Sequence, residues 1–97
     1  MPSSKEKEEI DFNLNGKRWK IRFVKSKEMP RSFGECDDPS VKNPEIWINR
    51  NLTDSEKLDT VIHEMLHATH PELSEESVFD TSKKITEVLK RIGFRFN

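Results

Sequence analysis

The sequence has no tyrosine, one cysteine and only three glycines among its 97 residues. Because a single cysteine cannot form an intramolecular disulfide, a disulfide-stapled fold is excluded. No apolar run approaches the roughly 20 residues that a membrane-spanning helix needs, so we expect no membrane segment. Residues 1–9 carry no hydrophobic stretch typical of a secretion signal, which leads us to expect a cytoplasmic protein.

The sequence also has no excess of charge of either sign, because its 17 Lys and Arg residues nearly balance its 18 Asp and Glu residues, which gives a net charge of -1. Charged residues make up 36% of the chain and apolar ones 32%, a balance that favours a soluble protein. It argues against a strong nucleic-acid footprint, although basic residues do recur between residues 17 and 27. Basic residues that alternate in this way are typical of the solvent-exposed face of a β-strand.

The first part of the chain predicts a short tail followed by a β-hairpin. Residues 1–9 are almost free of apolar side chains, and we expect a flexible tail there, followed by a single domain over residues 10–97. From residue 10 onwards apolar residues alternate with polar ones on both sides of the Asn15-Gly16 turn signal. The alternating apolar residues are Ile10, Phe12, Leu14, Trp19, Ile21 and Phe23.

Further strands and two helices complete the expected fold. Short strands are predicted at Phe33–Cys36 and Glu45–Asn49, after a polar connection over Lys25–Arg31 that contains about one helical turn. Asp37–Ser40 reads as a turn. The sequence therefore predicts an α+β fold, with a small antiparallel or mixed sheet packed on two helices.

Capping signals set the limits of both helices. Thr53 and Glu56 form a capping-box pattern at the start of a helix over Asp54–Thr69, which Pro71 ends. Ser74 caps a second helix that runs from Glu75 to about Ile92, where Gly93 stops it. The first helix gathers apolar residues on one side, namely Leu58, Val61, Ile62, Met65 and Ala68. The inward face of the second is expected to hold Val78, Ser82, Ile85, Leu89 and Ile92, with Phe94–Asn97 extended against the sheet.

The central motif is His63-Glu64-Met65-Leu66-His67 on the first helix. Side chains four residues apart lie on one helical face, so His63 and His67 can reach one metal ion. Both fall opposite the apolar stripe rather than inside it, which favours a metal site over two packing residues. The pattern predicts a Zn²⁺ ion with a third protein ligand.

Candidates for the third ligand follow the motif closely. His70 shares the face of the pair but lies about 10 Å along the axis from His63, too far for one ion to hold all three. On the second helix, Glu75 falls about 60° from the centre of the inward face and Glu76 about 160°. Glu75 is therefore the predicted ligand, and Glu76 stays open as the alternative because helix starts shift easily by one residue.

The residues around the predicted ion indicate peptide or amide hydrolysis. Glu64 lies 100° around the helix from His63, beside the ion, where it can act as the general base toward a water molecule. Asp59, one turn before His63, is either a group that orients a ligand imidazole or a solvated helix acid. With no tyrosine to stabilise an oxyanion, His70 is a possible substitute. Cys36 is expected to be a small half-buried side chain.

Residues 45–92, with the strand Ile46-Trp47-Ile48, the HExxH motif and the run Pro71-Glu72-Leu73-Ser74-Glu75-Glu76-Ser77-Val78, resemble the small zincin-like metallopeptidases of phages and bacteria. The chain looks most like the minimal gluzincin and ImmA/IrrE-type domains. That resemblance implies that His63 and His67 are ligands, that Glu64 is the general base and that Glu75 or Glu76 completes the site. It also implies a sheet whose edge strand lines the cleft.

The predicted function is zinc-dependent hydrolysis of a peptide or protein substrate. Because the sequence lacks any tyrosine and any added recognition domain, it favours a narrow substrate or an activity that needs a partner. The alternative is a binding or regulatory module that keeps the metal for stability. Neither nucleic acid nor membrane is an expected partner, and the sequence predicts no oligomeric state.

Overall fold

The computed structural model describes residues 8–28 and 32–95. They form four strands, one short 3₁₀ helix and two α-helices, with the bounds β1 Glu9–Leu14, β2 Lys17–Val24, η2 Ser26–Glu28, β3 Gly34–Cys36, β4 Glu45–Asn49, α1 Asp54–Thr69 and α2 Glu75–Arg91. Most of the expected tail lies outside the described residues. Glu9, which was predicted to belong to the tail, is the first residue of β1.

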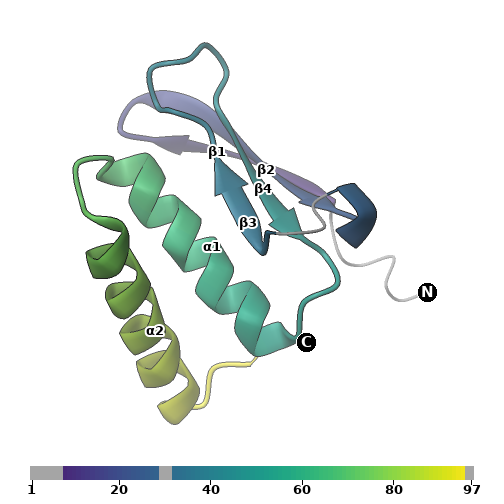
Figure 1. Cartoon of the computed structure of the whole chain (residues 1–97), viewed down its shortest axis with the longest axis vertical. Helices are drawn as coiled ribbons and strands as arrows, with labels where there is room; N and C mark the ends of the chain where they lie inside the picture. Colours follow the sequence, from purple (N-terminus) through teal and green to yellow (C-terminus); the bar gives the residue numbers. More distant parts are fainter. Residues whose placement is uncertain (1–7, 29–31, 96–97) are drawn as a thin grey trace.

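The strands form one mixed sheet in the order β1-β2-β4-β3. The outer pairs, β1 with β2 and β3 with β4, are antiparallel, and the central pair, β2 with β4, is parallel. Figure 1 shows this sheet on one side of the molecule and the two helices on the other. The predicted α+β class is confirmed, and β3 lies at one edge of the sheet.

The predicted hairpin is confirmed as β1 and β2, joined by Asn15 and Gly16. Both turn residues have positive φ, 52° and 78°, as the tight hairpin turn with the twist of the flanking strands requires. The register places Ile10 opposite Ile21 and Phe12 opposite Trp19, so the apolar residues of both strands share one face. That face contributes to the core.

Helix α1 lies between the sheet and α2, which gives the molecule three layers (Figure 1). It contacts β3 and β4 on one side and α2 on the other. The core between α1 and the sheet consists of Trp19, Ile21, Ile46, Ile48 and Ala68. The sheet was expected to pack on both helices. It packs on α1, whereas α2 packs against α1.

The capping signals place the helix ends correctly. The Thr53 hydroxyl accepts a hydrogen bond from Glu56 N at 3.2 Å, and Thr53 N donates to the Glu56 carboxylate at 3.0 Å. At α2, the Ser74 hydroxyl accepts from Ser77 N at 3.1 Å. Helix α2 ends at Arg91, one residue before the predicted end, and Gly93 follows with φ 93°. Neither α1 nor α2 combines the length and the apolarity needed to cross a bilayer.

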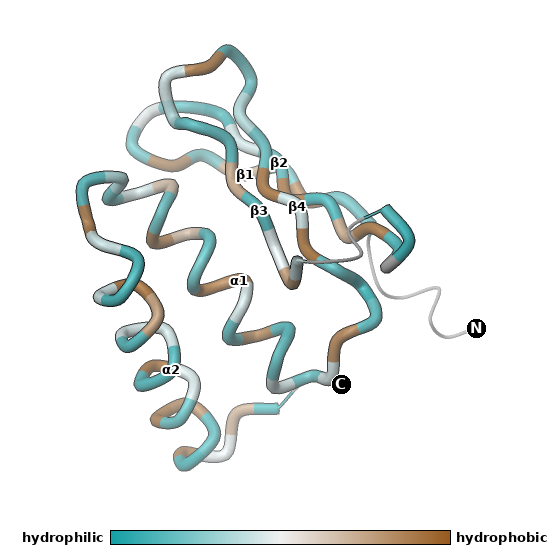
Figure 2. Tube along the Cα trace, viewed as in Figure 1, coloured by the Kyte–Doolittle hydropathy of each residue, from teal (hydrophilic) through white to brown (hydrophobic). Residues whose placement is uncertain are grey.

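The buried faces of the helices differ in part from the predicted stripes. On α2 the buried residues are Val78, Ser82 and Thr86, whereas Ile85 and Ile92 are 38% and 73% exposed. Val78, Ser82 and Thr86 are four residues apart and so share the face of α2 that packs on α1. Figure 2 shows hydrophobic residues at intervals along both helices.

The predicted apolar stripe of α1 is confirmed for Ala68, which lies in the core, and for Val61 and Met65, which pack against it. The buried residues of α1 also include polar ones, namely Lys57, Thr60 and Glu64.

One further expectation is corrected. The end of the chain was expected to lie on the sheet. In its described part, Phe94 and Arg95 line one pocket together with Asp54, Ser55 and Leu58 at the start of α1. Phe96 and Asn97 lie outside the described residues.

Candidate metal centre

Three potential ligand side chains meet between α1 and α2. His63 Nε2 lies 3.0 Å from Glu75 Oε2, and His67 Nε2 lies 2.9 Å from Glu75 Oε1. One ligand atom from each residue lies within 4.8 Å of the others. The centroids of the two imidazole rings are 4.9 Å apart, and the angle between the ring planes is 71°. Each ring thus presents its Nε2 atom to the same carboxylate.

The local sequence explains why Glu75 arrives at this point. The two histidines lie four residues apart on α1, and this helix ends at Thr69, just before His70 and Pro71. The turn that follows is closed by a hydrogen bond from Leu73 N to His70 O at 3.0 Å. Ser74 then caps α2, so Glu75 is the first residue of a helix that folds back along the first.

The donor set fits a divalent transition metal such as zinc. Two imidazole nitrogens and one carboxylate oxygen are a common set for a catalytic zinc ion, which leaves a fourth position for water or substrate. Ligand atoms of a tetrahedral zinc site are about 3.3 Å apart, given bonds of about 2.0–2.1 Å. In this structure the two nitrogen-to-oxygen distances of 3.0 and 2.9 Å run to different oxygens of Glu75, as in ion pairs. One ligand atom from each residue lies within 4.8 Å of the others, so the side chains would move closer together to hold one ion.

Glu64 lies beside this cluster beneath strand β3. Its side chain is buried, with 7% of the residue exposed. A Cβ atom on Gly34 would lie 3.1 Å from Glu64 Cγ and 3.2 Å from Glu64 Oε2, so the backbone of β3 passes directly over the carboxylate. Burial raises the pKa of Glu64 to about 7, against the opposing effect of His63, and the negative charge of Glu75 adds to the rise. The chain thus holds a proton on Glu64 up to nearly neutral pH.

The cluster opens into a cleft of about 580 Å³ between β3 and the two helices. One wall comes from β3 and the loop after it, and the opposite wall from α1, Pro71 and the start of α2. The lining residues are Gly34, Glu35, Cys36, Asp38, Pro39, His63, Glu64, His67, Pro71 and Glu75. A buried carboxylate and three potential metal ligands therefore face one solvent-accessible space.

The other candidates from the sequence lie elsewhere. Glu76 is exposed and is not part of the cluster found among the described residues. His70 Nδ1 lies 3.3 Å from Glu72, and His70 does not line the cleft. Asp59 Oδ2 lies 3.7 Å from Lys83 Nζ of α2, and Asp59 Oδ1 is buried without a hydrogen-bond partner among the described residues. Asp59 is therefore not the fully solvated helix acid that the sequence suggested.

Cys36 is half-buried, as expected, and lines the cleft. Burial raises the pKa of its thiol to about 12, and the charge of Glu64 adds to this effect. At neutral pH the side chain is therefore a neutral thiol.

Several cleft residues were missed in the sequence. Gly34 carries a signal, because an isolated glycine in a strand often marks a close approach of the backbone to another group. Asp38 and Pro39 belong to the predicted turn, but turn residues alone do not reveal which cleft they line. Their place depends on how β3 pairs with β4, which follows from the folded sheet.

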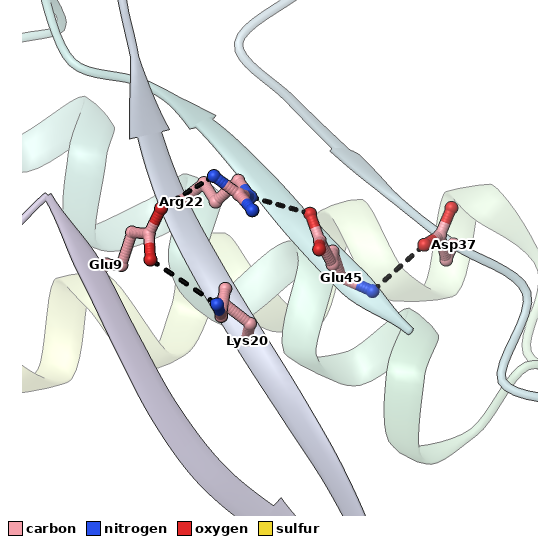
Figure 3. A network of polar contacts seen from close by, with 5 residues as sticks. All are labelled: Glu9, Lys20, Arg22, Asp37 and Glu45. Carbon is pink, nitrogen blue, oxygen red and sulfur yellow. Dashed lines mark hydrogen bonds and ion pairs between the residues drawn. The ribbon is translucent and has the colours of Figure 1, made fainter. Parts of the chain in front are cut away.

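The basic residues of the hairpin are largely engaged within the fold. Lys20 and Arg22 reach Glu9 at 3.4 and 2.6 Å, and Arg22 reaches Glu45 at 2.7 Å (Figure 3). The Lys17 ammonium group donates to Pro39 O at 2.5 Å. These contacts leave less positive charge for a phosphate backbone than the sequence alone suggests.

Comparisons with protein-family models, with curated proteins and with solved structures found no match.

Proposed function

We propose that this protein is a zinc-dependent peptidase. The observation that carries this proposal is the convergence of His63, His67 and Glu75 beside the buried carboxylate of Glu64, in a solvent-accessible cleft of about 580 Å³. Two histidines and a glutamate on adjacent helices leave room for a substrate atom or water at the fourth position of a zinc ion. The resemblance of residues 45–92 to zincin-like domains is part of this proposal, and so is a cytoplasmic location.

Glu64 is the proposed general base. A zinc ion held by His63, His67 and Glu75 would act as a Lewis acid toward the scissile carbonyl group and a water molecule. Glu64 accepts a proton from that water as the water attacks the carbonyl carbon, and then delivers the proton to the amine that leaves.

Strand β3 is the proposed binding edge for the substrate backbone. One side of β3 pairs with β4, and the strand occupies the edge of the sheet while lining the cleft. A peptide in an extended conformation can add to such an edge through main-chain hydrogen bonds. This arrangement would hold a peptide bond next to Glu64, because the backbone of Gly34 passes over that carboxylate.

The alternative function, a binding module that uses the metal for stability, is favoured by the contact between α1 and α2. Two of the three buried residues of α2 are polar, Ser82 and Thr86, and Thr86 Oγ1 has no hydrogen-bond partner within the described part of the chain. A metal bound by residues of both helices would strengthen this weakly apolar contact without any turnover.

Substitution Glu64→Gln separates the two functions. The amide keeps the shape of the side chain but cannot serve as a general base, so we expect peptide hydrolysis to fall by at least about 100-fold. Zinc content and fold should remain, because Glu64 is not among the proposed ligands. Cleavage of a peptide pool, followed by mass spectrometry, measures the activity. Equal behaviour of the wild type and the variant on every peptide would reject the peptidase and leave the binding module.

A further inference from the structure

The wall of the cleft opposite α2 includes the loop that follows β3, and hydrogen bonds to neighbouring strands hold this loop in place. Asp37 continues the pairing of β3 with β4, since Asp37 N donates to Glu45 O and Glu45 N donates to the Asp37 carboxylate, both at 2.9 Å. The second of these bonds appears in Figure 3, at the end of the ion-pair network that crosses the sheet. The base of the loop is thus anchored to the central part of the sheet.

The tip of the loop is held from a different strand. Lys17, the first residue of β2, donates from its ammonium group to Pro39 O at 2.5 Å and to Val41 O at 3.3 Å. Val41 N also donates to Asp38 O at 3.1 Å, which closes the turn. These contacts from two strands fix the position of Asp38 and Pro39 in the wall of the cleft.

Four carboxylates line the cleft, and within its described lining there is no lysine or arginine. Glu64 and Glu75 belong to the proposed reaction centre. The Glu35 carboxylate lies 3.3 Å from the Ser32 hydroxyl, and Glu35 alternates along β3 with Gly34 and Cys36, the residues that face α1. Glu35 and Asp38 are thus the two lining carboxylates outside the proposed chemistry, and Asp38 is the one in the loop that Lys17 and Asp37 hold in place.

The Asp38 side chain is both ionised and restrained. Its Oδ1 atom accepts a hydrogen bond from Ser40 N at 2.8 Å, and this bond, together with the nearby charge of Lys17, lowers the pKa of the carboxyl. No ion pair to Asp38 occurs within residues 8–28 and 32–95. Lys17 itself is directed to the two loop carbonyls. An exposed, fixed anion therefore faces the space that a substrate would occupy.

We infer that Asp38 is a specificity-determining residue, which favours peptide substrates with a lysine or arginine near the bound segment. This inference rests on the proposed function, since it concerns the same cleft. A cationic side chain from a peptide lying along β3 can pair with a carboxylate fixed in the adjoining loop, whereas an acidic side chain is repelled. The energy of one exposed ion pair corresponds to a preference of up to about fivefold.

The test uses alanine-based decapeptides in which one Lys, Gln or Glu is walked through the sequence. Binding of each peptide to the zinc-loaded Glu64→Gln variant is measured, and so is cleavage of each peptide by the wild type. We expect about fivefold tighter binding of the best Lys peptide than of its Gln counterpart, a preference that shrinks as salt is added. It should disappear in Asp38→Asn and turn toward Glu peptides in Asp38→Lys. The matched control is Asp11→Asn, the same change on β1 at the opposite edge of the sheet, which should keep the preference.

Each outcome decides between the two proposals. A Lys preference that survives in Asp38→Asn, or cleavage without any preference for basic residues, overturns the role of Asp38 while the peptidase stands. An Asp38-dependent preference in binding without cleavage by the wild type supports the role of Asp38 and rejects the peptidase. Peptides that are neither bound nor cut overturn both proposals.

Discussion

At the scale of single residues, the candidate site depends on one close approach, between the backbone of β3 and the side chains of α1. A Cβ atom on Gly34 would lie 2.6 Å from Thr60 Cγ2 and 3.1 Å from Glu64 Cγ. Any other residue type at this position would require a shift of the Thr60 side chain, the helix or the strand. Gly34 thus determines how deeply the Glu64 carboxylate is buried.

Substitution Gly34→Ala is therefore expected to destabilise the protein by about 1–3 kcal/mol through overpacking. In an unhindered strand the same change would stabilise by about 0.5–1 kcal/mol, so the sign of the effect reports the clash. Thr60→Ser removes the Cγ2 atom and should relieve much of the cost. Urea unfolding of both single variants and the double variant measures this coupling. Additive effects in that cycle would show that the two residues are not in contact.

The raised pKa of Glu64 gives a pH-dependent stability in the metal-free protein. The folded state keeps the proton up to a pH of about 7, whereas the unfolded chain releases it near its ordinary pKa of 4.5. The stabilisation from the protonated carboxyl is therefore complete below pH 4.5 and is lost as the pH rises through 7.

Glu64→Gln removes this titration, so the free energy of unfolding of the variant, relative to that of the wild type, should rise by about 3 kcal/mol between pH 4.5 and pH 8. Urea unfolding in the presence of a chelator at several pH values measures the difference. A constant difference between the two proteins across this range would mean that the Glu64 pKa is not raised.

At the scale of elements, the position of Glu75 depends on the start of α2. Glu75 follows the N-cap residue Ser74 directly, and a fraying first turn would move its carboxylate away from His63 and His67. The cap of α1 at Thr53 lies far from the motif along the chain, ten residues before His63. Thr53 is therefore a control for Ser74, because both residues cap a helix but only Ser74 is next to a potential metal ligand.

Ser74→Ala and Thr53→Ala should each lower the free energy of unfolding by about 1 kcal/mol. Only Ser74→Ala should also weaken zinc binding, by roughly fivefold, an energy of the size of one helix cap. Competition for zinc with a chromophoric chelator measures the affinity. An equal loss of affinity in the two variants would place the effect in general stability rather than in the first turn of α2.

Local sequence signals were sufficient for the elements and insufficient for their packing. The Thr53 and Ser74 caps and the Asn15-Gly16 turn predicted the hairpin and the helix starts, because each depends on neighbouring residues only. The predicted stripe on α2 is confirmed for Val78 and Ser82, but Thr86, which was not predicted, is buried, while Ile85 and Ile92 are exposed. A helix buries the face that its partner presents to it, and the partner of α2 is α1 rather than the sheet.

The same distinction applies to the candidate site. Helical spacing placed His63 and His67 on one face, and the phase of the second helix favoured Glu75 over Glu76. The structure has Glu75 beside both imidazoles, while metal binding by the three residues stays a prediction. The contribution of Gly34 and Asp38 could not be derived, because it requires the pairing of β3 with β4 and the parallel pairing of β2 with β4.

At the scale of the whole molecule, three layers are joined by two contacts of different character. The sheet and α1 share an apolar core, whereas α2 meets α1 through Val78 together with polar residues and the Lys83 pair with Asp59. The candidate metal ligands lie across this second contact. A bound ion would therefore act on the less apolar of the two contacts.

Zinc should raise the thermal stability of the protein and slow amide exchange in α2 more than in the sheet. Binding to the folded state alone contributes about 2.7 kcal/mol when free zinc is 100 times its dissociation constant. Addition of a chelator should reverse both effects. Differential scanning calorimetry and hydrogen exchange measure them, and protection confined to the sheet would argue against an ion between the helices.

The central claim is that one zinc ion binds between α1 and α2 through His63, His67 and Glu75. Isothermal titration calorimetry of zinc into the wild type, Glu75→Ala and Glu76→Ala tests it, because the two variants remove the same group from neighbouring positions. We predict one zinc per chain for the wild type and Glu76→Ala, and an affinity lower by about tenfold or more for Glu75→Ala. A wild type without stoichiometric zinc, or equal affinities in the two variants, would contradict the account.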